Sequence, residues 1–323
     1  MPVTEAGAAV VTLEDIRAAS KRIRPNAKRT PVMTSRSFDA ESGVRAFFKC
    51  ENLQTGGAFK IRGASNFVAQ LTAEQLSRGV VAYSSGNHAQ AVAIAARNAG
   101  ASATLVMPLD APRNKVEATR GQGARIVTYD RFTEDRTAIG KRIAEETGAA
   151  LVPPFDHPWI IAGQGTTALE LLEEIPDLDA IAVPIGGGGL ISGCSIAAKG
   201  MKPGIRVIGV EPEDGNDTFL SLAAGKRVEI PAPGTIADGL RSPMPGEMTF
   251  PIIQRNVERV VLVTDEEIRR AVKFLLLRMK ILVEPSGAAT VAAALSGKLR
   301  GMGGRVGVVI SGGNVDFEAL AEL

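Results

Sequence analysis

The sequence predicts an α/β fold with parallel sheets, and three observations support this prediction. Short β-branched runs alternate with longer helical patterns, which is the order found in βαβ units. The chain has 323 residues, of which 45% are hydrophobic, so it can bury one large core or two smaller ones. Loops rich in glycine and serine follow several predicted strands, where open parallel sheets bind their ligands.

Capping boxes and apolar periodicity predict the elements of the first half. Thr12 with Asp15 predicts a helix that runs to residue 23, and Thr72 with Gln75 opens another. An apolar stripe predicts a helix at 64–71. The same patterns predict strands at 44–50, 80–83, 104–107 and 125–129, and helices at 87–99, 114–121 and 134–147.

The proline-rich segment 153–158 interrupts this alternation, so we expect it to return the chain between two lobes. Thr264 with Glu267 predicts the start of a later helix that has one apolar face. The other elements predicted after residue 158 are helices at 165–174 and from the glycines at 186–189 to residue 199, with strands at 180–185, 207–211 and 306–310.

Composition limits the expected partners to small molecules. Lys and Arg number 37 against 35 Asp and Glu, so the net charge of +2 predicts no basic surface for nucleic acid. Residues 180–198 carry no charge, but Pro184 and four glycines interrupt them, so no membrane span is expected, and no signal peptide is recognised. Cys50 and Cys194 are too few for a disulfide framework, which favours a reducing compartment such as the cytoplasm.

Lys60 is the first candidate for chemistry. It lies in Gly-Gly-Ala-Phe-Lys-Ile-Arg-Gly-Ala at 56–64, between small residues and the apolar-striped helix. Desolvation lowers the pKa of an amine, and a neutral amine attacks an aldehyde to form a Schiff base. The alternative is a solvated surface lysine beside a glycine turn.

Four consecutive glycines at 186–189 lie between a predicted strand and a predicted helix. Backbone N–H groups in such a run can surround an anion, and the helix N-terminus adds a favourable dipole, so the run predicts a phosphate site. A tight turn without a ligand is the alternative. Spacing argues against a dinucleotide fingerprint, because G-x-G-x-x-G would need glycine in place of Ile191 or Ser192.

Two further loops follow predicted strands. The loop at 84–88 offers two serine hydroxyls, an asparagine amide and N–H groups at a helix start, which suit a carboxylate or a phenolic oxygen; plain helix capping is the alternative. Residues 311–314 end the last strand. Because the carboxyl ends of parallel strands meet at one edge, we expect these loops, the glycines and Lys60 to share one crevice.

A reactive lysine, a site for one phosphate and hydroxyl-rich loops together describe a site for pyridoxal phosphate. Over nearly its whole length the chain resembles the fold-type II pyridoxal phosphate enzymes, specifically the serine/threonine dehydratase and serine racemase group. The motifs that carry this resemblance are Gly-Ala-Phe-Lys-Ile-Arg-Gly at 57–63, Ser-Ser-Gly-Asn-His at 84–88, Ala-Gly-Gln-Gly-Thr at 162–166, the four glycines, Thr-Ile-Ala-Asp-Gly at 235–239 and Ser-Gly-Gly-Asn-Val-Asp at 311–316.

The resemblance implies a two-lobed α/β fold with helices on both faces of each parallel sheet and the cofactor in the crevice between the lobes. It implies a large cofactor-binding domain formed by residues 1–71 and 155–323 and a small mobile domain at 72–154. A homodimer is implied as well. A C-terminal regulatory domain of the kind found in biosynthetic threonine dehydratases is not expected.

The resemblance also assigns roles by position. It implies that Lys60 holds the cofactor as a Schiff base and that Phe59 packs on the ring. Asn87 would bond the ring hydroxyl and Ser311 the pyridine nitrogen, which would stay unprotonated and favour elimination over transamination. Ser85 would act on the opposite ring face. The residues expected to hold the phosphate are Gly186, Gly187, Gly188 and Gly189.

Segment 211–217 resembles the cation loop of this family. Glu211, the Gly215 carbonyl and Asp217 would supply hard oxygen ligands for Mg²⁺, Ca²⁺ or Mn²⁺. An acidic surface turn is the alternative.

The function that the resemblance implies is β-elimination of a small β-hydroxy amino acid such as L-threonine or L-serine, giving a 2-oxo acid and ammonia, with Lys60 as general base. Two alternatives stay open. One is a 3-hydroxyaspartate dehydratase, which gives oxaloacetate and ammonia. Segments 107–112, 153–158 and 211–217 most resemble this branch of the family. The other is a serine racemase with dehydratase side activity.

Several residues are candidates for contact with the substrate. Arg136 matches a basic position that reaches toward a bound diacid in the racemases, although a solvated helix arginine is an equal alternative. His88 belongs to the candidate loop, and its ring is also interpreted as structural. Ala58 departs from the serine that the family often has there. The full set of candidate substrate contacts is Ser84, Ser85, Gly86, His88, Arg136 and Ser242.

Two other classes of protein bind the same cofactor. A β-replacement synthase would share the fold, but its usual Thr-Ser-Gly-Asn-Thr and Gly-Thr-Gly-Gly-Thr loops do not occur in this sequence. A non-catalytic carrier would bind the cofactor and release no ammonia.

Overall fold

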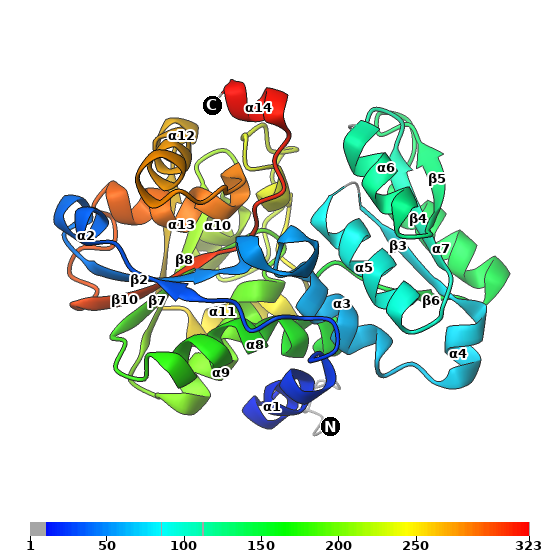
Figure 1. The fold of residues 1–323 in the computed structure, drawn as a ribbon, viewed down its shortest axis with the longest axis horizontal. Coiled ribbons are helices and arrows are strands. Elements are labelled where there is room, and N and C mark those ends of the chain that lie inside the picture. The colour runs from blue at the N-terminus through cyan, green and yellow to red at the C-terminus, as the bar shows by residue number, and fades with distance from the viewer. Residues whose placement is uncertain (1–10, 85, 112, 323) are drawn as a thin grey trace.

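The computed structural model describes residues 11–84, 86–111 and 113–322, and in these ranges the chain folds into two lobes (Figure 1). The larger lobe is built on a six-stranded sheet in the order β1-β2-β10-β7-β8-β9, and the smaller lobe on a four-stranded sheet in the order β5-β4-β3-β6. The prediction of an α/β fold with parallel sheets is confirmed.

Every neighbouring pair in the larger sheet is parallel except β1 with β2. Strand β10 is central, because Val306 pairs with Ala46 on one side and with Ala180 on the other. The parallel strands therefore send their carboxyl ends to one edge, where the candidate loops emerge. The strands are β1 (Val32–Met33), β2 (Arg45–Cys50), β7 (Ala180–Pro184), β8 (Arg206–Pro212), β9 (Arg259–Val263) and β10 (Arg305–Ile310).

Helices cover both faces of the larger sheet (Figure 1). On one face Phe38 of α2 packs in a cluster with residues of α12 and α13. Its ring meets that of Phe48 edge to face, at 4.8 Å between centroids. On the other face α8 packs against α9 and α1. The helical elements are α1 (Leu13–Arg22), α2 (Arg36–Ser42), α8 (Pro158–Glu174), α9 (Gly189–Met201), α10 (Asp217–Ala224), α11 (Thr249–Asn256), α12 (Asp265–Phe274), α13 (Pro285–Leu295), α14 (Phe317–Ala321), the short turns η1 (Glu51–Leu53), η2 (Thr55–Gly57) and η3 (Asp238–Leu240), and the π-helical turn η4 (Leu275–Met279).

The smaller sheet is parallel throughout. Helix α5 covers one face, and Ile139 of α7 packs with Val106 and Tyr129 on the other. Helix α3 contacts both α5 and α8, so it connects the two lobes. The elements are β3 (Val80–Tyr83), β4 (Ala103–Pro108), β5 (Arg125–Tyr129), β6 (Ala150–Leu151), α3 (Lys60–Val68), α4 (Ala73–Arg78), α5 (Asn87–Asn98), α6 (Arg113–Gly121) and α7 (Arg136–Thr147).

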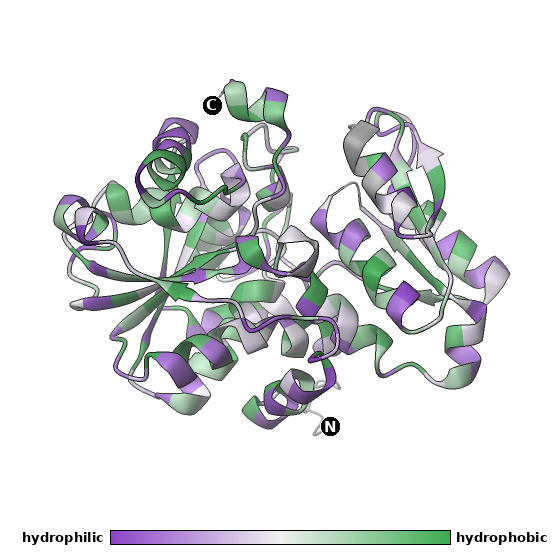
Figure 2. Cartoon of the chain, in the orientation of Figure 1, coloured by the Kyte–Doolittle hydropathy of each residue, from purple (hydrophilic) through white to green (hydrophobic). Residues whose placement is uncertain are grey.

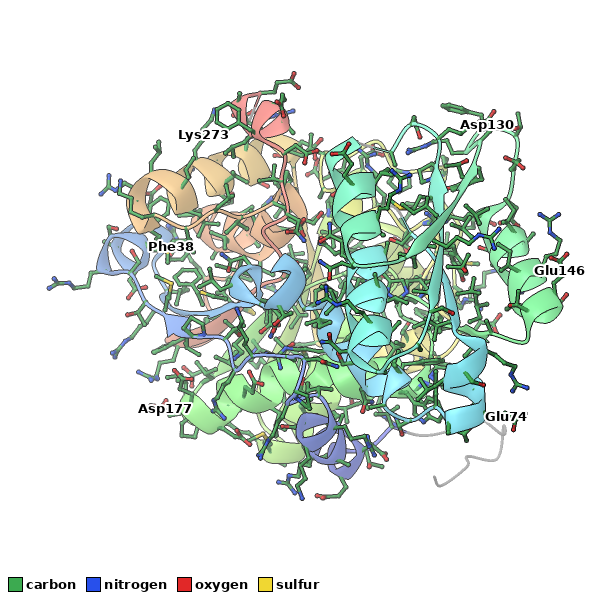
Figure 3. The ribbon with its side chains drawn as sticks, turned by 45° about the vertical axis from the view of Figure 1, so that its right-hand side comes forward. Phe38, Glu74, Asp130, Glu146, Asp177 and Lys273 are labelled. Carbon is green, nitrogen blue, oxygen red and sulfur yellow. The ribbon has the colours of Figure 1, made fainter. Side chains whose placement is uncertain are left out.

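Hydrophobic residues concentrate on the strands and on the helix faces turned toward them (Figure 2). Charged side chains such as Glu74, Glu146 and Lys273 project from the outer surface (Figure 3). In the ranges that the structure describes, no helix has both the length and the apolar character needed to cross a bilayer.

Two predicted helices begin earlier than the sequence suggested. Helix α8 starts at Pro158 and not at 165, because the His157 ring caps the Trp159 N–H at 3.1 Å and proline suits the first helical turn. Helix α3 starts at Lys60 and not at 64. The lysine is therefore the first residue of a helix and not part of a loop before it.

Candidate active site

Lys60 lies at the carboxyl edge of the larger sheet, held by the loop that follows β10. Ala58 forms a β-bridge with Gly312, and the Phe59 N–H donates to the Ser311 carbonyl at 3.0 Å. Ser311, the predicted partner of the pyridine nitrogen, is thus a hydrogen-bonded neighbour of the lysine segment. The backbone itself brings these two predicted site residues together.

This approach requires glycine at position 57. Gly57 has a φ of +73°, and a Cβ atom placed there would lie 2.1 Å from Oδ1 of Asn314. The Gly313 N–H donates to the Gly57 carbonyl at 2.9 Å, which completes the pairing of the two loops.

The Lys60 amine is half-buried and points back toward the proline-rich segment. Its Nζ donates to the Pro154 carbonyl at 2.9 Å. Burial lowers the pKa of the amine from 10.5 to about 8, although the negative charge of Glu284 acts in the opposite direction. Near pH 7 about one amine in ten is then neutral, against fewer than about one in a thousand for an ordinary lysine. The amine is suited to attack a carbonyl and to act as a base.

The four glycines occupy positions where side chains would clash. A Cβ on Gly187 would lie 2.2 Å from the Phe155 ring, and one on Gly189 would lie 2.5 Å from Oε1 of Gln164. Gly188 has a φ of +90°, which favours glycine. Within the described ranges, the N–H groups of Gly186, Gly187 and Gly188 have no backbone acceptor. Free N–H groups at the start of α9 fit a phosphate.

Phe155 links the glycines to the lysine. Its ring lies against Gly187, and its neighbour Pro154 accepts the Lys60 hydrogen bond. The next residue, Asp156, accepts backbone N–H bonds from residues 247–249 at 2.9 to 3.2 Å. The proline-rich segment therefore forms one wall between the amine and the phosphate site.

The loop at 84–88 reaches the same place from the smaller lobe. Asn87 begins α5, and its Nδ2 donates to Oε1 of Glu284 at 2.8 Å. Its Oδ1 accepts from Nδ2 of Asn314 at 2.8 Å. The Gly86 N–H donates to the Ser84 hydroxyl at 3.3 Å. The predicted site residue Ser85 lies outside the described residues.

His88 is buried beneath this loop. Its Nε2 is 3.0 Å from the Val152 carbonyl, and because a carbonyl only accepts, this nitrogen carries the proton. Burial lowers the pKa of the ring to about 3, with a further contribution from the charge of Lys60. The ring is therefore neutral and ties α5 to the segment that follows β6.

Two candidate substrate contacts, Arg136 and Ser242, do not contact the residues described above. Arg136 is exposed at the start of α7, and its guanidinium has no partner among the described residues. Gly140, one turn further on, packs against the Tyr83 ring, which precedes Ser84. Arg136 therefore stands on the helix that flanks the loop. The Ser242 hydroxyl donates to the Met244 carbonyl at 2.9 Å.

Glu211 and Asp217 form a second candidate site beyond the end of β8. Both are buried, and Glu211 accepts N–H bonds from Thr218 at 3.1 Å and Phe219 at 2.8 Å. Neither Asp217 carboxylate oxygen has a partner among the described residues. Burial raises the pKa of Asp217 to about 7 and also raises that of Glu211, to which the charge of Asp217 contributes. The alternative of an exposed acidic turn is wrong for these two carboxylates.

Three residues that face the site were not assigned a role from the sequence: Glu284, Phe155 and Asn314. Glu284 directly precedes α13, whose first residue is a proline. The signal available was Glu-Pro-Ser-Gly at 284–287, in which proline marks a helix start and Gly287 allows contact with Gly312.

Comparison with known proteins gives strong matches over almost the whole chain. A family model described as pyridoxal-phosphate dependent enzyme matches residues 23–312. L-threo-3-hydroxyaspartate ammonia-lyase of Saccharomyces cerevisiae is 50% identical over 97% of this chain and 96% of that protein. Serine racemase of Schizosaccharomyces pombe is 48% identical, with 96% of each chain covered. The solved structure of maize serine racemase has a TM-score of 0.94 at 46% identity and covers 97% of both chains.

Proposed function

Because the chain belongs to the pyridoxal-phosphate-dependent enzymes, we propose that it is an ammonia-lyase that releases ammonia from a small β-hydroxy amino acid by β-elimination of the hydroxyl. The observation that carries this proposal is the Lys60 amine, whose pKa is lowered to about 8 and which segment 154–155 links to the four glycines. The products are a 2-oxo acid and ammonia.

The residues proposed to hold the cofactor are those that the backbone gathers around Lys60. The glycine N–H groups suit the phosphate, the Ser311 hydroxyl suits a ring nitrogen, and the Asn87 amide suits a phenolic oxygen. When bound, the cofactor supplies an aldehyde for the amine and a ring that withdraws electrons from the substrate. Phe59 is proposed to pack on that ring.

Lys60 is proposed to take the α-proton of the substrate on Nζ. A base with a pKa near the working pH combines a useful neutral fraction with sufficient basicity. The β-hydroxyl leaves with a proton as water, and water is taken up again when ammonia is released, so the amino acid yields a 2-oxo acid. Hydroxyls and N–H groups at the start of α5 suit the substrate carboxylate, and Ser85 is proposed as the group on the opposite face.

Two observations favour L-threo-3-hydroxyaspartate over L-threonine and L-serine as the preferred substrate. A relative that is 50% identical is named for that substrate. The Arg136 guanidinium, which has no partner in the ranges that the structure describes, lies on the helix that flanks the substrate loop and can bind a second carboxylate in a bidentate manner. Serine racemisation is the second candidate, because a relative that is 48% identical is a serine racemase.

Ammonia release from a panel of substrates tests the function. With pyridoxal phosphate present, we expect ammonia from L-threo-3-hydroxyaspartate, L-threonine and L-serine, with the highest kcat/KM for the diacid. Arg136→Ala is expected to lower kcat/KM for the diacid by about 10- to 100-fold, the value of a charged hydrogen bond, while leaving L-threonine unchanged. Arg142→Ala, on the same helix, is the matched control.

A panel in which no substrate releases ammonia would refute the lyase proposal. An equal loss on L-threonine in the Arg136 variant would refute the role of that arginine. Chiral chromatography of the L-serine reaction measures any D-serine and so tests the racemase alternative.

A divalent cation is proposed between Glu211 and Asp217, with the Gly215 carbonyl as a further ligand. The support is chemical: two buried carboxylates interact, and neither oxygen of Asp217 has a partner within the described part of the chain. Hard oxygen ligands of this kind suit Mg²⁺ or Ca²⁺. The cation would balance two charges that otherwise repel each other.

Added Mg²⁺ is expected to raise the Tm of the protein more at pH 8 than at pH 5.5. The pKa of Asp217 is raised from 3.8 to about 7 by burial, so the cation-free protein loses stability as the pH rises from about 4 to about 7. Bound Mg²⁺ restores that stability. Differential scanning fluorimetry with EDTA or MgCl₂ measures the effect.

Asp217→Asn is the control for the cation, since it removes one of the two carboxylates. It is expected to show a smaller pH slope, from Glu211 alone, and no gain with Mg²⁺. The cation site would be contradicted if Mg²⁺ raised the Tm of the parent protein equally at both pH values, or if EDTA did not change that Tm.

Assembly, domain division and location also remain proposals. A homodimer is supported by exposed leucines on adjoining segments of the larger lobe, Leu53, Leu277 and Leu282, and sedimentation velocity measures its mass. The small mobile domain is proposed at 72–154, which contains β3 to β6. Two free, buried cysteines, Cys50 and Cys194, support a cytoplasmic location.

A further inference from the structure

Glu284 is a buried carboxylate that faces the candidate site from the start of α13. It is 5% exposed, and its N–H donates to the Gly312 carbonyl at 3.2 Å. A Cβ atom on Gly312 would lie 2.2 Å from Oε1 of Glu284, so the carboxylate lies directly against the loop that follows β10. The same Oε1 accepts the hydrogen bond from Asn87.

The direction of the hydrogen bonds that run from Gly56 to Glu284 is fixed at both ends. The Gly56 carbonyl can only accept, so Asn314 presents its Nδ2 there at 2.7 Å and donates from the same group to Oδ1 of Asn87 at 2.8 Å. At the other end an ionised carboxylate can only accept, so Asn87 presents Nδ2 to Glu284.

Both ends therefore require the same orientation of the Asn87 amide. Its oxygen is occupied by Asn314, and one of its two N–H groups is occupied by Glu284. Among the described residues the second N–H has no acceptor, which leaves it for a ligand. Without Glu284 only the bond from Asn314 would hold this orientation, and a rotation of the amide by 180° would exchange this donor for an acceptor, which would repel an anionic oxygen.

We propose that Glu284 is a positioning residue that acts through Asn87 and keeps an N–H group of that amide directed at the phenolic oxygen of the cofactor. The inference rests on the proposed function, because it names how this chain orients one residue of the cofactor site. The charge of Glu284 also acts on Lys60, where it raises the pKa of the amine against the effect of burial. One carboxylate thus influences both the amine and the amide.

Glu284→Gln tests the proposal, because glutamine has nearly the same shape but can donate as well as accept. We expect the Kd for pyridoxal phosphate to rise about tenfold, the value of one hydrogen bond to a charged group. We also expect the absorbance maximum of the bound cofactor to shift. Glu267→Gln makes the same change in the first turn of another helix, α12. It is expected to alter neither the Kd for pyridoxal phosphate nor the absorbance maximum.

A double-variant cycle separates the route through Asn87 from a direct effect. In an Asn87→Ala background, Glu284→Gln is expected to cause no further loss of affinity, since the amide that it orients is gone. Asn314→Ala, which frees the other end of the amide, is a second single variant and is expected to shift the absorbance in the same way.

Each outcome decides between the two claims. Additive losses in the cycle would overturn the route through Asn87, and unchanged affinity and absorbance in Glu284→Gln would overturn the role of Glu284. A parent protein that forms no absorbing complex with pyridoxal phosphate would overturn the proposed function itself.

Discussion

Lys60→Ala is expected to abolish ammonia release while leaving the fold intact. Burial lowers the pKa of this amine to about 8, and the amine is proposed both to hold the cofactor and to move the α-proton. Loss of a general base alone costs about 10²- to 10⁴-fold in rate, and loss of covalent attachment adds to that. We therefore expect turnover to fall by at least about 10⁴-fold.

The measurement pairs activity with chemistry at the residue. Borohydride treatment of the parent with pyridoxal phosphate should fix a pyridoxyl group on Lys60, found by mass spectrometry, and the variant should carry none. Lys273→Ala changes an exposed lysine on α12 and serves as the control. Ammonia release retained in Lys60→Ala, or a parent adduct at another lysine only, would contradict the assignment.

The gathering of the site at one sheet edge could be predicted from the sequence because it follows from topology. Parallel strands of one sheet end on the same side, so the loops after β7 and β10 had to approach each other. The loop after β3 belongs to the smaller sheet, and its approach depends on how the two lobes pack. The three predicted capping boxes are also present, since each depends on two residues three positions apart. Capping by residues close in sequence can therefore be predicted without knowledge of the tertiary structure.

The parts that were missed depend on contacts distant in sequence. Glu284 lies 197 positions from Asn87, and no local pattern joins them. Helix α13 is so rich in alanine that all its residues are buried, and it shows no amphipathic stripe to predict it. The short strands β1 and β6 have two residues each, too few for a period to be recognised. Helix α8 was predicted seven residues late because a proline at a helix start resembles a loop.

A second feature that the sequence did not reveal is a buried network of ion pairs around Arg62, close to Lys60 in the sequence. Arg62 is fully buried two residues after Lys60, and it pairs with Glu51 at 2.7 Å and with Glu170 at 2.7 Å. Lys49 also pairs with Glu170, at 2.6 Å, so two positive and two negative charges balance. Burial alone would raise the pKa of Glu51, but the charge and hydrogen bonds of Arg62, the charge of Lys49 and the hydrogen bond from Thr30 together outweigh it, and the pKa is lowered.

The network joins elements that must stay in register if Lys60 is to keep its place. Arg62 lies on α3, Glu170 on α8 and Lys49 on β2. The guanidinium also bonds the Thr166 hydroxyl at 3.0 Å and the Lys28 carbonyl at 3.2 Å, so its donors are well satisfied. Such a network specifies position more than it adds stability, because desolvation offsets most of the attraction.

Arg62→Met is accordingly expected to lower the free energy of unfolding by about 3–5 kcal/mol, because two buried carboxylates would be left with one lysine. Their charged forms would then be disfavoured in the folded state. The loss relative to the parent should therefore be smaller at pH 5 than at pH 8, since protonation relieves the excess charge. Urea unfolding at both pH values measures it.

Two comparisons distinguish a balanced network from a simple loss of packing. Arg62→Met with Glu51→Gln removes one charge of each sign and leaves the Lys49–Glu170 pair, so it should be more stable than Arg62→Met alone. Arg78→Ala breaks an exposed pair with Glu74 and should cost no more than about 0.5 kcal/mol. If the double variant were less stable than the single one, the loss would have to come from packing, and charge balance would not be what holds α3, with Lys60 at its start, in place.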